Sequence, residues 1–301
     1  MSDRGRLLRL LPYGPAPHLS LCRFLRWTFT ERRERLRPPR EHGAAFLRYC
    51  MGMTRPQTTK IPEAFTGRGI KTWGLTIASV AYLGGAMRRI ALTGPALEAF
   101  ACEPGNDMMV PLAENGGPTV CRRYTIRHFD RASRRLELDL VLHGEGIGSR
   151  WASSAAVGDV VELGGPRGKI TLATDAAWHL FAGDDSAIPA TFAMMEALPE
   201  GVWSRALLSI ARAGDEQPHR PRAGDQVMWL HRVPGGTDAT RAFADALSGA
   251  PPERGHVYIA GESMLVAALK KAALMRGLAP DQVSAKAYWA RDRVNGGHGE
   301  P

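Results

Sequence analysis

Short alternating runs of apolar and polar residues fill the chain from Ile70 to Lys169. Trp73, Leu75 and Ile77 lie at every second position, which is the spacing of a strand with one buried face. Similar runs, separated by turn residues such as Asn115-Gly116-Gly117-Pro118 and Gly164-Gly165-Pro166, cover Arg89–Leu92, Asp107–Leu112, Arg122–Phe129, Leu136–Leu142 and Val160–Leu163. Five or six strands at this spacing predict an antiparallel barrel or sandwich, with one helix around Gly148–Val157.

The pattern changes near Trp178, where buried strands begin to alternate with helical spacing. Strands are predicted over Trp178–Ala182, Ala206–Ile210, Val227–Leu230 and Val257–Ala260, and helices over Ile188–Leu198, Thr237–Ser248 and Met264–Arg276, the last ended by Gly277. This alternation predicts a parallel α/β sheet. A β-barrel followed by an α/β domain is the ferredoxin-reductase-like arrangement. We place the first domain at residues 69–174 and the second, with a C-terminal aromatic segment, at 175–301.

The formal charge of +9 is concentrated at the start of the chain. Residues 1–50 hold 11 Lys and Arg against 4 Asp and Glu, and the rest of the chain holds 28 against 26. The near-neutral body gives no reason to expect a nucleic-acid partner. We interpret residues 1–68 as a basic extension that is disordered, or as sequence read from an upstream start codon. In the second case Met51 or Met53 is the true start. A functional basic arm is the alternative.

Cysteine spacing and hydropathy exclude several classes of protein. Cys22, Cys50, Cys102 and Cys121 form no C-x-x-C pair, so they predict neither a zinc site, nor an iron–sulfur cluster, nor a disulfide framework. The apolar stretch Gly74–Met87 is too short to span a bilayer. We therefore expect a cytoplasmic protein with reduced thiols, no bound metal and no stable membrane association.

The hexapeptide Arg122–Arg127 carries the most informative chemistry. Strand geometry assigns its residues to two faces, which hold Arg122, Tyr124 and Ile126 on one side and Arg123, Thr125 and Arg127 on the other. An aromatic ring, a short hydroxyl and cations are what a flavin dinucleotide needs from a protein that positions it. The alternative is an edge strand with ordinary surface arginines.

Further blocks follow the hexapeptide in a fixed order: Val141–Gly144, Gly148–Ala152, Val157–Asp159, Gly164–Gly168, Gly183–Ala190, Trp229–Arg232, Ala260–Glu262 and Tyr288–Trp289. Together they resemble the siderophore-interacting proteins, which are FAD-dependent ferric-siderophore reductases. The resemblance extends from about Gly69 to Arg291.

This resemblance implies FAD-binding roles for residues of the first domain. Tyr124 would lie against the isoalloxazine, Thr125 near its N5, and Arg122 at the diphosphate, which a planar guanidinium suits. Further FAD contacts would come from two later blocks, which hold His143, Gly144, Ser149, Trp151 and Ala152. Simpler explanations stay open: a strand-end histidine at His143, a helix N-cap at Ser149, core packing for Trp151 and a surface role for Arg127.

Nicotinamide dinucleotide binding is implied at Gly183, Asp184, Asp185 and Ser186 and again at Gly261 and Glu262. Both blocks end a predicted strand, where open α/β sheets bind their ligands. Helix capping is the alternative for Asp184 and Asp185. The choice between NADH and NADPH stays open, because Arg212 suits a 2′-phosphate while Asp215 and Glu216 suit ribose hydroxyls.

The late aromatic pair Tyr288-Trp289 would shape the nicotinamide pocket or cover the flavin, and we assign Trp289 to the catalytic group with Tyr124 and Thr125. Burial of the aromatic pair is the alternative. Because many ferric siderophores are anionic, Lys286, Arg291 and Arg293 are the candidate substrate residues. The strand at Asp107 departs from the family, since it lacks the basic residue often found there.

The sequence therefore predicts a monomeric, NAD(P)H-dependent ferric-siderophore reductase. Electrons would pass from NADPH or NADH through FAD to Fe(III), releasing Fe(II) for iron assimilation. One alternative is a flavin reductase with another physiological acceptor. The other is a non-enzymatic siderophore-binding or iron-sensing protein.

Overall fold

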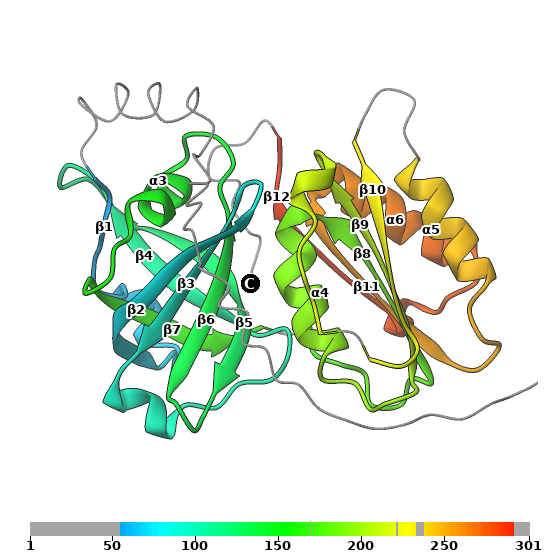
Figure 1. Ribbon diagram of the computed structural model, residues 1–301, viewed down its shortest axis with the longest axis horizontal. Coiled ribbons are helices and arrows are strands. Elements are labelled where there is room, and N and C mark those ends of the chain that lie inside the picture. The colour runs from blue at the N-terminus through cyan, green and yellow to red at the C-terminus, as the bar shows by residue number, and fades with distance from the viewer. Residues whose placement is uncertain (1–54, 169, 221, 233–237, 292–301) are drawn as a thin grey trace, which may run out of the picture. The chain divides into compact units, whose positions relative to one another are not determined.

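The computed structural model describes residues 55–168, 170–220, 222–232 and 238–291 (Figure 1). The first half of this region is built from antiparallel strands, which are β1 (Gln57–Thr58), β2 (Thr72–Gly84), β3 (Met87–Thr93), β4 (Asp107–Ala113), β5 (Val120–Asp130), β6 (Arg135–Val141) and β7 (Val160–Arg167). Three short helices accompany them: α2 (Glu63–Thr66), the 3₁₀ helix η1 (Pro95–Ala99) and α3 (Ile147–Ser154).

Six of these strands close into a barrel. The order is β1-β4-β5-β6-β3-β2-β7, and β7 also pairs with β4. Apolar residues at alternate positions fill the interior, so Leu75, Ile77, Ile90 and Leu138 are almost fully buried. The predicted antiparallel barrel is confirmed.

The predicted strand break at Gly164-Gly165-Pro166 is wrong, because β7 continues through it to Arg167. Gly164 pairs with Thr72 of β2 on one side and with Met109 of β4 on the other. Gly165 has a φ of 138°, a conformation that L side chains rarely adopt. The glycines let the strand bend from one neighbour to the other and close the barrel.

The segment from Arg55 to Arg68 differs from the disordered extension expected there. Gln57 and Thr58 pair with the end of β4, and Ile61 is buried with its backbone N–H on Glu162 at 2.7 Å. An apolar anchor in an otherwise polar stretch is enough to fix this segment to the barrel. Residues 1–54, including both candidate start methionines, lie outside the described residues.

The second half is a parallel sheet with helices on its faces. Its strands are β8 (Trp178–Asp184), β9 (Trp203–Ile210), β10 (Asp225–His231), β11 (Gly255–Glu262) and β12 (Val283–Trp289), in the order β10-β9-β8-β11-β12. Its α-helices are α4 (Ile188–Met195), α5 (Ala239–Ser248) and α6 (Ser263–Met275), with 3₁₀ turns η2 (Asp185–Ala187), η3 (Ala213–Asp215) and η4 (Pro280–Gln282). All four strand pairings are parallel, which confirms the ferredoxin-reductase-like arrangement.

Helix boundaries follow local capping. The helix predicted from Thr237 begins at Ala239, because the side chain of Asp238 accepts from the Thr240 N–H; Thr237 itself lies outside the described residues. The α6 helix ends before Gly277, whose φ is 90°.

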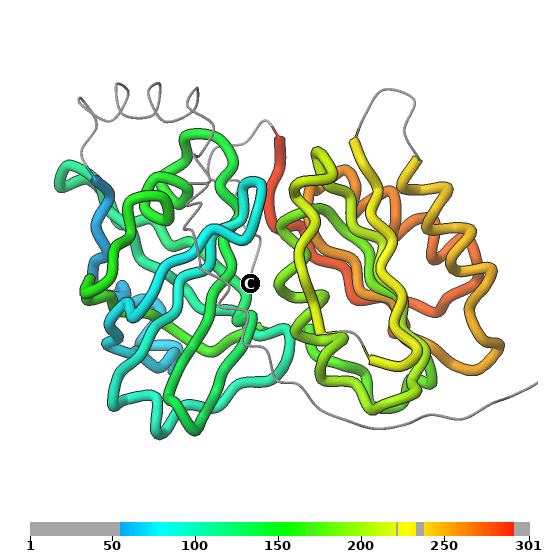
Figure 2. The backbone as a smooth tube through the Cα atoms, in the orientation of Figure 1, coloured from blue at the N-terminus to red at the C-terminus, as the bar shows by residue number. Residues whose placement is uncertain are grey.

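The strand β12, red in Figure 2, was not anticipated as a strand of the sheet. It pairs in parallel with β11 from Val257↔Val283 to Glu262↔Trp289. Its pattern Val-Ser-Ala-Lys-Ala-Tyr-Trp lacks the apolar run of a central strand, because an edge strand is only partly covered. The late aromatic pair therefore ends the fifth strand of the parallel sheet.

Candidate functional site

The two faces predicted for β5 are those observed. Ile126 is buried in the barrel core and Tyr124 packs against that core, whereas Thr125 and Arg127 contact residues of the α/β domain. The Tyr124 ring stacks on Trp151 of α3, with centroids 6.2 Å apart and planes at 27°. A Cβ on Gly148 would lie 2.4 Å from the Tyr124 hydroxyl, so only glycine lets α3 pack this closely. Burial raises the pKa of the Tyr124 phenol.

The start of α3 is open, and Ser149 is not its N-cap. Gly146 occupies the N-cap position, and none of the described side chains caps it. The Ser149 hydroxyl instead donates to the His143 carbonyl at 2.9 Å and accepts from the His143 N–H at 3.2 Å. Gly144, with a φ of 63°, and Gly146 have no described atom within 4 Å of where a Cβ would stand. First-turn N–H groups are therefore left for an anion.

Two residues predicted to touch FAD have buried side chains. Trp151 is 2% exposed and Ala152 is fully buried, and both belong to the barrel core. Their side chains anchor α3 beneath Tyr124. Arg122 lies beside the same helix, with its Cγ 3.4 Å from the Cβ position of Gly148. The structure thus gathers Arg122 and Tyr124 at α3.

A second cluster forms where β4 and β5 meet β12. The Thr125 hydroxyl lies within hydrogen-bonding reach of the Tyr288 phenol, and burial raises the pKa of Tyr288 to about 12. Lys286 Nζ lies 3.4 Å from Asp107 Oδ2. Asp107 pairs directly with Thr125 across the β4–β5 ladder. Asp107 Oδ1 also lies 3.8 Å from Arg123 Nε, so this carboxylate is shared between a predicted substrate lysine and an arginine.

Asp184, 2% exposed, joins three strands at their carboxyl ends. Its Oδ2 accepts from the Glu262 N–H at 2.7 Å and from Trp289 Nε1 at 2.9 Å, and its Oδ1 accepts from the Ser186 N–H at 2.9 Å and hydroxyl at 2.5 Å. Burial raises the pKa of Asp184, although these hydrogen bonds oppose the rise. The predicted alternative of a capping role for Asp184 agrees with these contacts.

The neighbouring predicted residues have structural partners as well. Asp185 accepts from Arg232 at 2.8 Å, and Glu262 caps α6 by accepting from the N–H groups of Met264 and Leu265. Gly183 has no room for a side chain, since a Cβ would lie 2.2 Å from the Ala260 carbonyl oxygen. The two glycine–acid blocks meet at one edge of the sheet, as predicted from the strand ends.

Trp289 connects the residues beside α3 in the barrel with the cluster around Asp184. Its ring stacks on His143 of the barrel, with centroids 5.4 Å apart and planes at 28°. The same residue donates to Asp184. His143, at the end of β6, and the carboxyl ends of β8, β11 and β12 thus meet at one indole.

The remaining predicted cations are more scattered. Arg291 is exposed and close enough to Glu262 to favour its ionised form. Arg293 lies outside the described residues. Arg212 is largely exposed and lies 3.7 Å from Asp215, while Glu216 contacts His231 at 3.1 Å.

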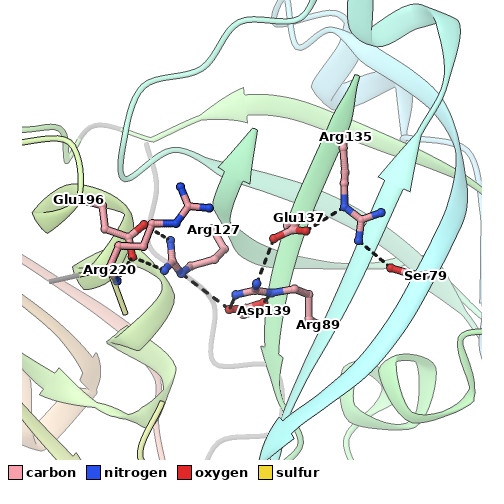
Figure 3. A network of polar contacts seen from close by, with 8 residues as sticks. All are labelled: Ser79, Arg89, Arg127, Arg135, Glu137, Asp139, Glu196 and Arg220. Atoms are coloured by element: carbon pink, nitrogen blue, oxygen red, sulfur yellow. Dashed lines mark hydrogen bonds and ion pairs between the residues drawn. The ribbon is translucent and has the colours of Figure 1, made fainter. Parts of the chain in front are cut away.

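An ion-pair network across the two domains was missed. Arg127 is 8% exposed and donates both of its Nη groups to Glu196, which follows α4 (Figure 3). Its Nε lies 3.9 Å from Asp139 Oδ2, and Arg89 engages Asp139 with two hydrogen bonds of 2.6 and 2.8 Å. The alternative of a surface role for Arg127 is therefore wrong, because its side chain is buried. The period of two along β5 predicts that Arg127 and Thr125 share a face of the strand. Nothing in the sequence predicts that Glu196 is the ion-pair partner of Arg127.

Comparison with known proteins agrees with this geometry. The siderophore-interacting protein family matches residues 176–292, and its FAD-binding domain matches residues 111–170. The chain belongs to the siderophore-interacting protein family. Family relatives include ferric vibriobactin reductase ViuB of Vibrio cholerae, 33% identical over 182 residues, which cover 58% of this chain and 66% of that protein.

Two more family comparisons extend further along the chain. An NADPH-dependent ferric-chelate reductase of Escherichia coli is 26% identical over 71% of this chain and 91% of its own length. The crystal structure of a siderophore utilization protein from T. fusca superposes with a TM-score of 0.66 and 27% identity, over 81% of this chain and 99% of that one. The chain spans between about half and two thirds of the curated relatives that it matches most strongly, at 55% and 66% of their lengths.

Proposed function

We propose that this protein is a flavoprotein oxidoreductase that carries electrons from NADPH or NADH through FAD to a ferric siderophore. The contact that carries the proposal joins Thr125 of β5 to Tyr288 of β12, with Trp289 beside it on Asp184. This contact brings β5, the barrel strand that we propose binds FAD, next to the carboxyl ends of the strands in the parallel sheet, where dinucleotides bind. The names of the Vibrio and Escherichia relatives support iron chelates as the acceptor.

The described residues fit FAD. The uncapped start of α3, with Gly144 and Gly146 open beside it, suits a diphosphate. The Arg122 Cγ lies next to this helix, and we propose that the guanidinium, which donates to the Cys121 carbonyl at 3.2 Å, also serves a diphosphate bound there. FAD, when bound, supplies the conversion of a two-electron donor into one-electron steps. We propose Arg122 and the backbone of α3 for the diphosphate, and Tyr124 and Thr125 for the ring system.

The chain's own residues have four tasks in this reaction. Thr125 offers a hydroxyl that can donate or accept a hydrogen bond at the ring edge, and the Tyr288 phenol lies within hydrogen-bonding reach of that hydroxyl. Trp289 and His143, with their rings stacked, would form one side of the nicotinamide pocket. The loop from Asp184 to Ser186 is fixed by its own hydrogen bonds before a nicotinamide dinucleotide arrives. Such preorganisation keeps the two reacting rings in a productive geometry.

Iron needs no ligand from the protein in this scheme. Hard oxygen ligands of the siderophore hold Fe(III) more tightly than Fe(II), so reduction releases the metal. On the protein side we propose Lys286 and Arg291 as residues that the chelate meets. Asp107 lies 3.4 Å from Lys286 and 3.8 Å from Arg123, so we infer that its one carboxylate does not cancel both cations and that anionic chelates are favoured. We further propose that the protein works as a monomer in the cytoplasm. Across the described residues, no helix is long and apolar enough to cross a membrane.

The direct test is an anaerobic absorbance titration of the purified, FAD-loaded protein. NADPH or NADH is added first, and a ferric siderophore second. We expect the flavin absorbance to bleach with one nicotinamide and to recover with the iron complex. Bleaching without recovery would reject that acceptor and favour a flavin reductase with another one. A protein that binds the siderophore but never bleaches would be a non-enzymatic binder or would use another electron donor.

A further inference from the structure

The barrel strand β5 makes two contacts with the α/β domain from the same face. Thr125 reaches Tyr288 of β12, and Arg127, two residues later, reaches Glu196 after α4. Residues two apart on a strand lie about 7 Å apart and point the same way. The strand proposed to hold the flavin ring is therefore also the strand on which the other domain is docked.

The contact at Arg127 is specific in its geometry. Nη1 donates to Glu196 Oε2 at 2.8 Å and Nη2 donates to Oε1 at 2.5 Å, which is a two-point contact that lysine cannot make. The Arg220 N–H donates to the same Oε1 at 3.0 Å. On the barrel side, Asp139 faces the Arg127 Nε and is itself held by Arg89 (Figure 3). Both sides of the guanidinium are thus fixed.

Glu196 lies at the C-terminal end of α4, the helix that follows the proposed nicotinamide loop. It is the C-cap residue of α4, where the helix dipole disfavours a negative charge, so the carboxylate depends on its cationic partner. The other end of α4 follows directly on Asp184–Ala187, the loop proposed to bind the nicotinamide dinucleotide. The helix therefore links a residue clamped to the flavin strand with the loop that holds the electron donor.

Apolar packing alone does not fix this relationship. Met87 of β3 packs in one buried cluster with Phe192 and Met195 of α4, and such contacts are non-directional. They keep the domains together when the ion pair is removed. The directional hydrogen bonds of Arg127 select one arrangement of the packed surfaces.

We propose that the Arg127–Glu196 pair is a clamp that sets the distance between the flavin and nicotinamide sites. Arg127 is then a positioning residue for hydride transfer, and this inference rests on the proposed function. Hydride transfer requires the reacting atoms to be about 3–3.5 Å apart, and a misplacement of roughly 1 Å can cost 100-fold in rate. A clamp on the far end of α4 acts on that distance without touching either ligand.

The test compares Arg127→Lys and Glu196→Gln with the control Arg222→Lys. Arg222 is a control for the loss of a buried ion pair beside the same helix end, because its side chain is also 8% exposed, pairs with Asp225, and donates to the Leu198 and Pro199 carbonyls just after α4, all inside the α/β domain. Stopped-flow mixing with NADPH or NADH measures the rate of flavin reduction and its primary deuterium isotope effect. Separate titrations give the FAD and NADP⁺ dissociation constants.

We expect both clamp variants to slow flavin reduction by roughly tenfold or more, with dissociation constants within about twofold of wild type. Arg127→Ala should recover part of its rate when guanidinium ion is added, and Arg222→Lys should reduce flavin at nearly the wild-type rate. The clamp is overturned if Arg127→Lys and Arg222→Lys slow the reaction equally, or if the rate falls only in proportion to lost FAD.

Hydrogen exchange of the flavin-free protein separates this inference from the proposed function. Arg127→Ala should speed exchange both at the end of α4 and in β5. Arg222→Lys, which loosens only contacts inside the α/β domain, should leave exchange in β5 unchanged. If neither nicotinamide reduces the wild-type flavin, the proposed function fails. The clamp is then judged by exchange alone, and unchanged protection of α4 in Arg127→Ala rejects it.

Discussion

Trp289 donates its indole N–H to Asp184 at 2.9 Å and thereby ties the end of β12 to the end of β8. The same carboxylate accepts from the Glu262 N–H of β11, which lies between these strands in the sheet. One buried carboxylate therefore aligns three strand ends. The proposed nicotinamide site lies at these aligned strand ends.

Replacing Trp289 by Phe should test this alignment. The ring that stacks on His143 is retained in part, but the bond to the buried Asp184 is lost, so we expect about 1–3 kcal/mol less stability in urea denaturation. Flavin reduction by nicotinamide should slow as well. The matched control is Trp178→Phe, which loses an indole hydrogen bond to the Glu253 carbonyl at the other end of the sheet. If both variants lose the same rate, Trp289 has no special role.

Gly261 should tolerate no side chain. Its φ is 131°, and a Cβ would lie 2.7 Å from the Asp184 carboxyl carbon. We expect Gly261→Ala to lower the free energy of unfolding by about 2–4 kcal/mol, since backbone strain and a steric clash add. Gly277→Ala is the control, because φ is 90° there and no described atom lies within 4 Å of the added Cβ. Equal losses in thermal melts of the two variants would show that the contact with Asp184 is unimportant.

Asp107→Asn should change the preference among acceptors. The substitution removes the negative charge that Lys286 and Arg123 share but keeps the side chain's shape. We expect KM for anionic ferric chelates to fall by roughly 2- to 10-fold at low salt, and the gain to shrink as ionic strength screens the charge. KM for a neutral chelate should stay the same. An equal change for charged and neutral chelates would mean that Lys286 does not face the acceptor.

Buried histidine should limit acid stability. Burial lowers the pKa of His179 to about 4, and its Nδ1 lies 3.3 Å from the Tyr258 hydroxyl. Because the unfolded state binds a proton near pH 6.5 and the folded state does not, stability is present above that pH and is lost as pH falls toward 4. The loss amounts to up to about 3 kcal/mol. Urea midpoints between pH 7 and pH 4 measure it, and His179→Asn should flatten the profile. A variant with the wild-type slope would assign the effect to other groups.

Much of the fold could be read from periodicity. Alternation at Trp73, Leu75 and Ile77 identified β2, and the change of texture near Trp178 identified the parallel sheet. Periodicity does not predict the edge strand β12, because its residues are only partly covered and form no apolar run. The glycine pair Gly164-Gly165 predicts either a strand end or a bend within a strand, and the structure has the bend.

The candidate site could be predicted only in outline. The faces of β5 follow from a period of two, so Thr125 and Tyr124 were correctly separated. Partners distant in the chain do not follow from any period. Asp107 lies 179 residues from Lys286 and Arg127 lies 69 from Glu196, and only the folded topology brings each pair together. The roles of the predicted ligand-binding residues stay predictions.

The strand β5 both carries the proposed flavin residues and contacts the α/β domain, and this restricts which parts of the protein can be exchanged between family members. A chimera that takes its barrel from one family member and its α/β domain from another would keep both folds. It would also carry Thr125 and Arg127 without the Tyr288 and Glu196 that they contact in this chain. A working chimera should therefore take α4 and β12 from the same parent protein as β5. The piece to exchange is this set of contacting elements rather than a whole domain.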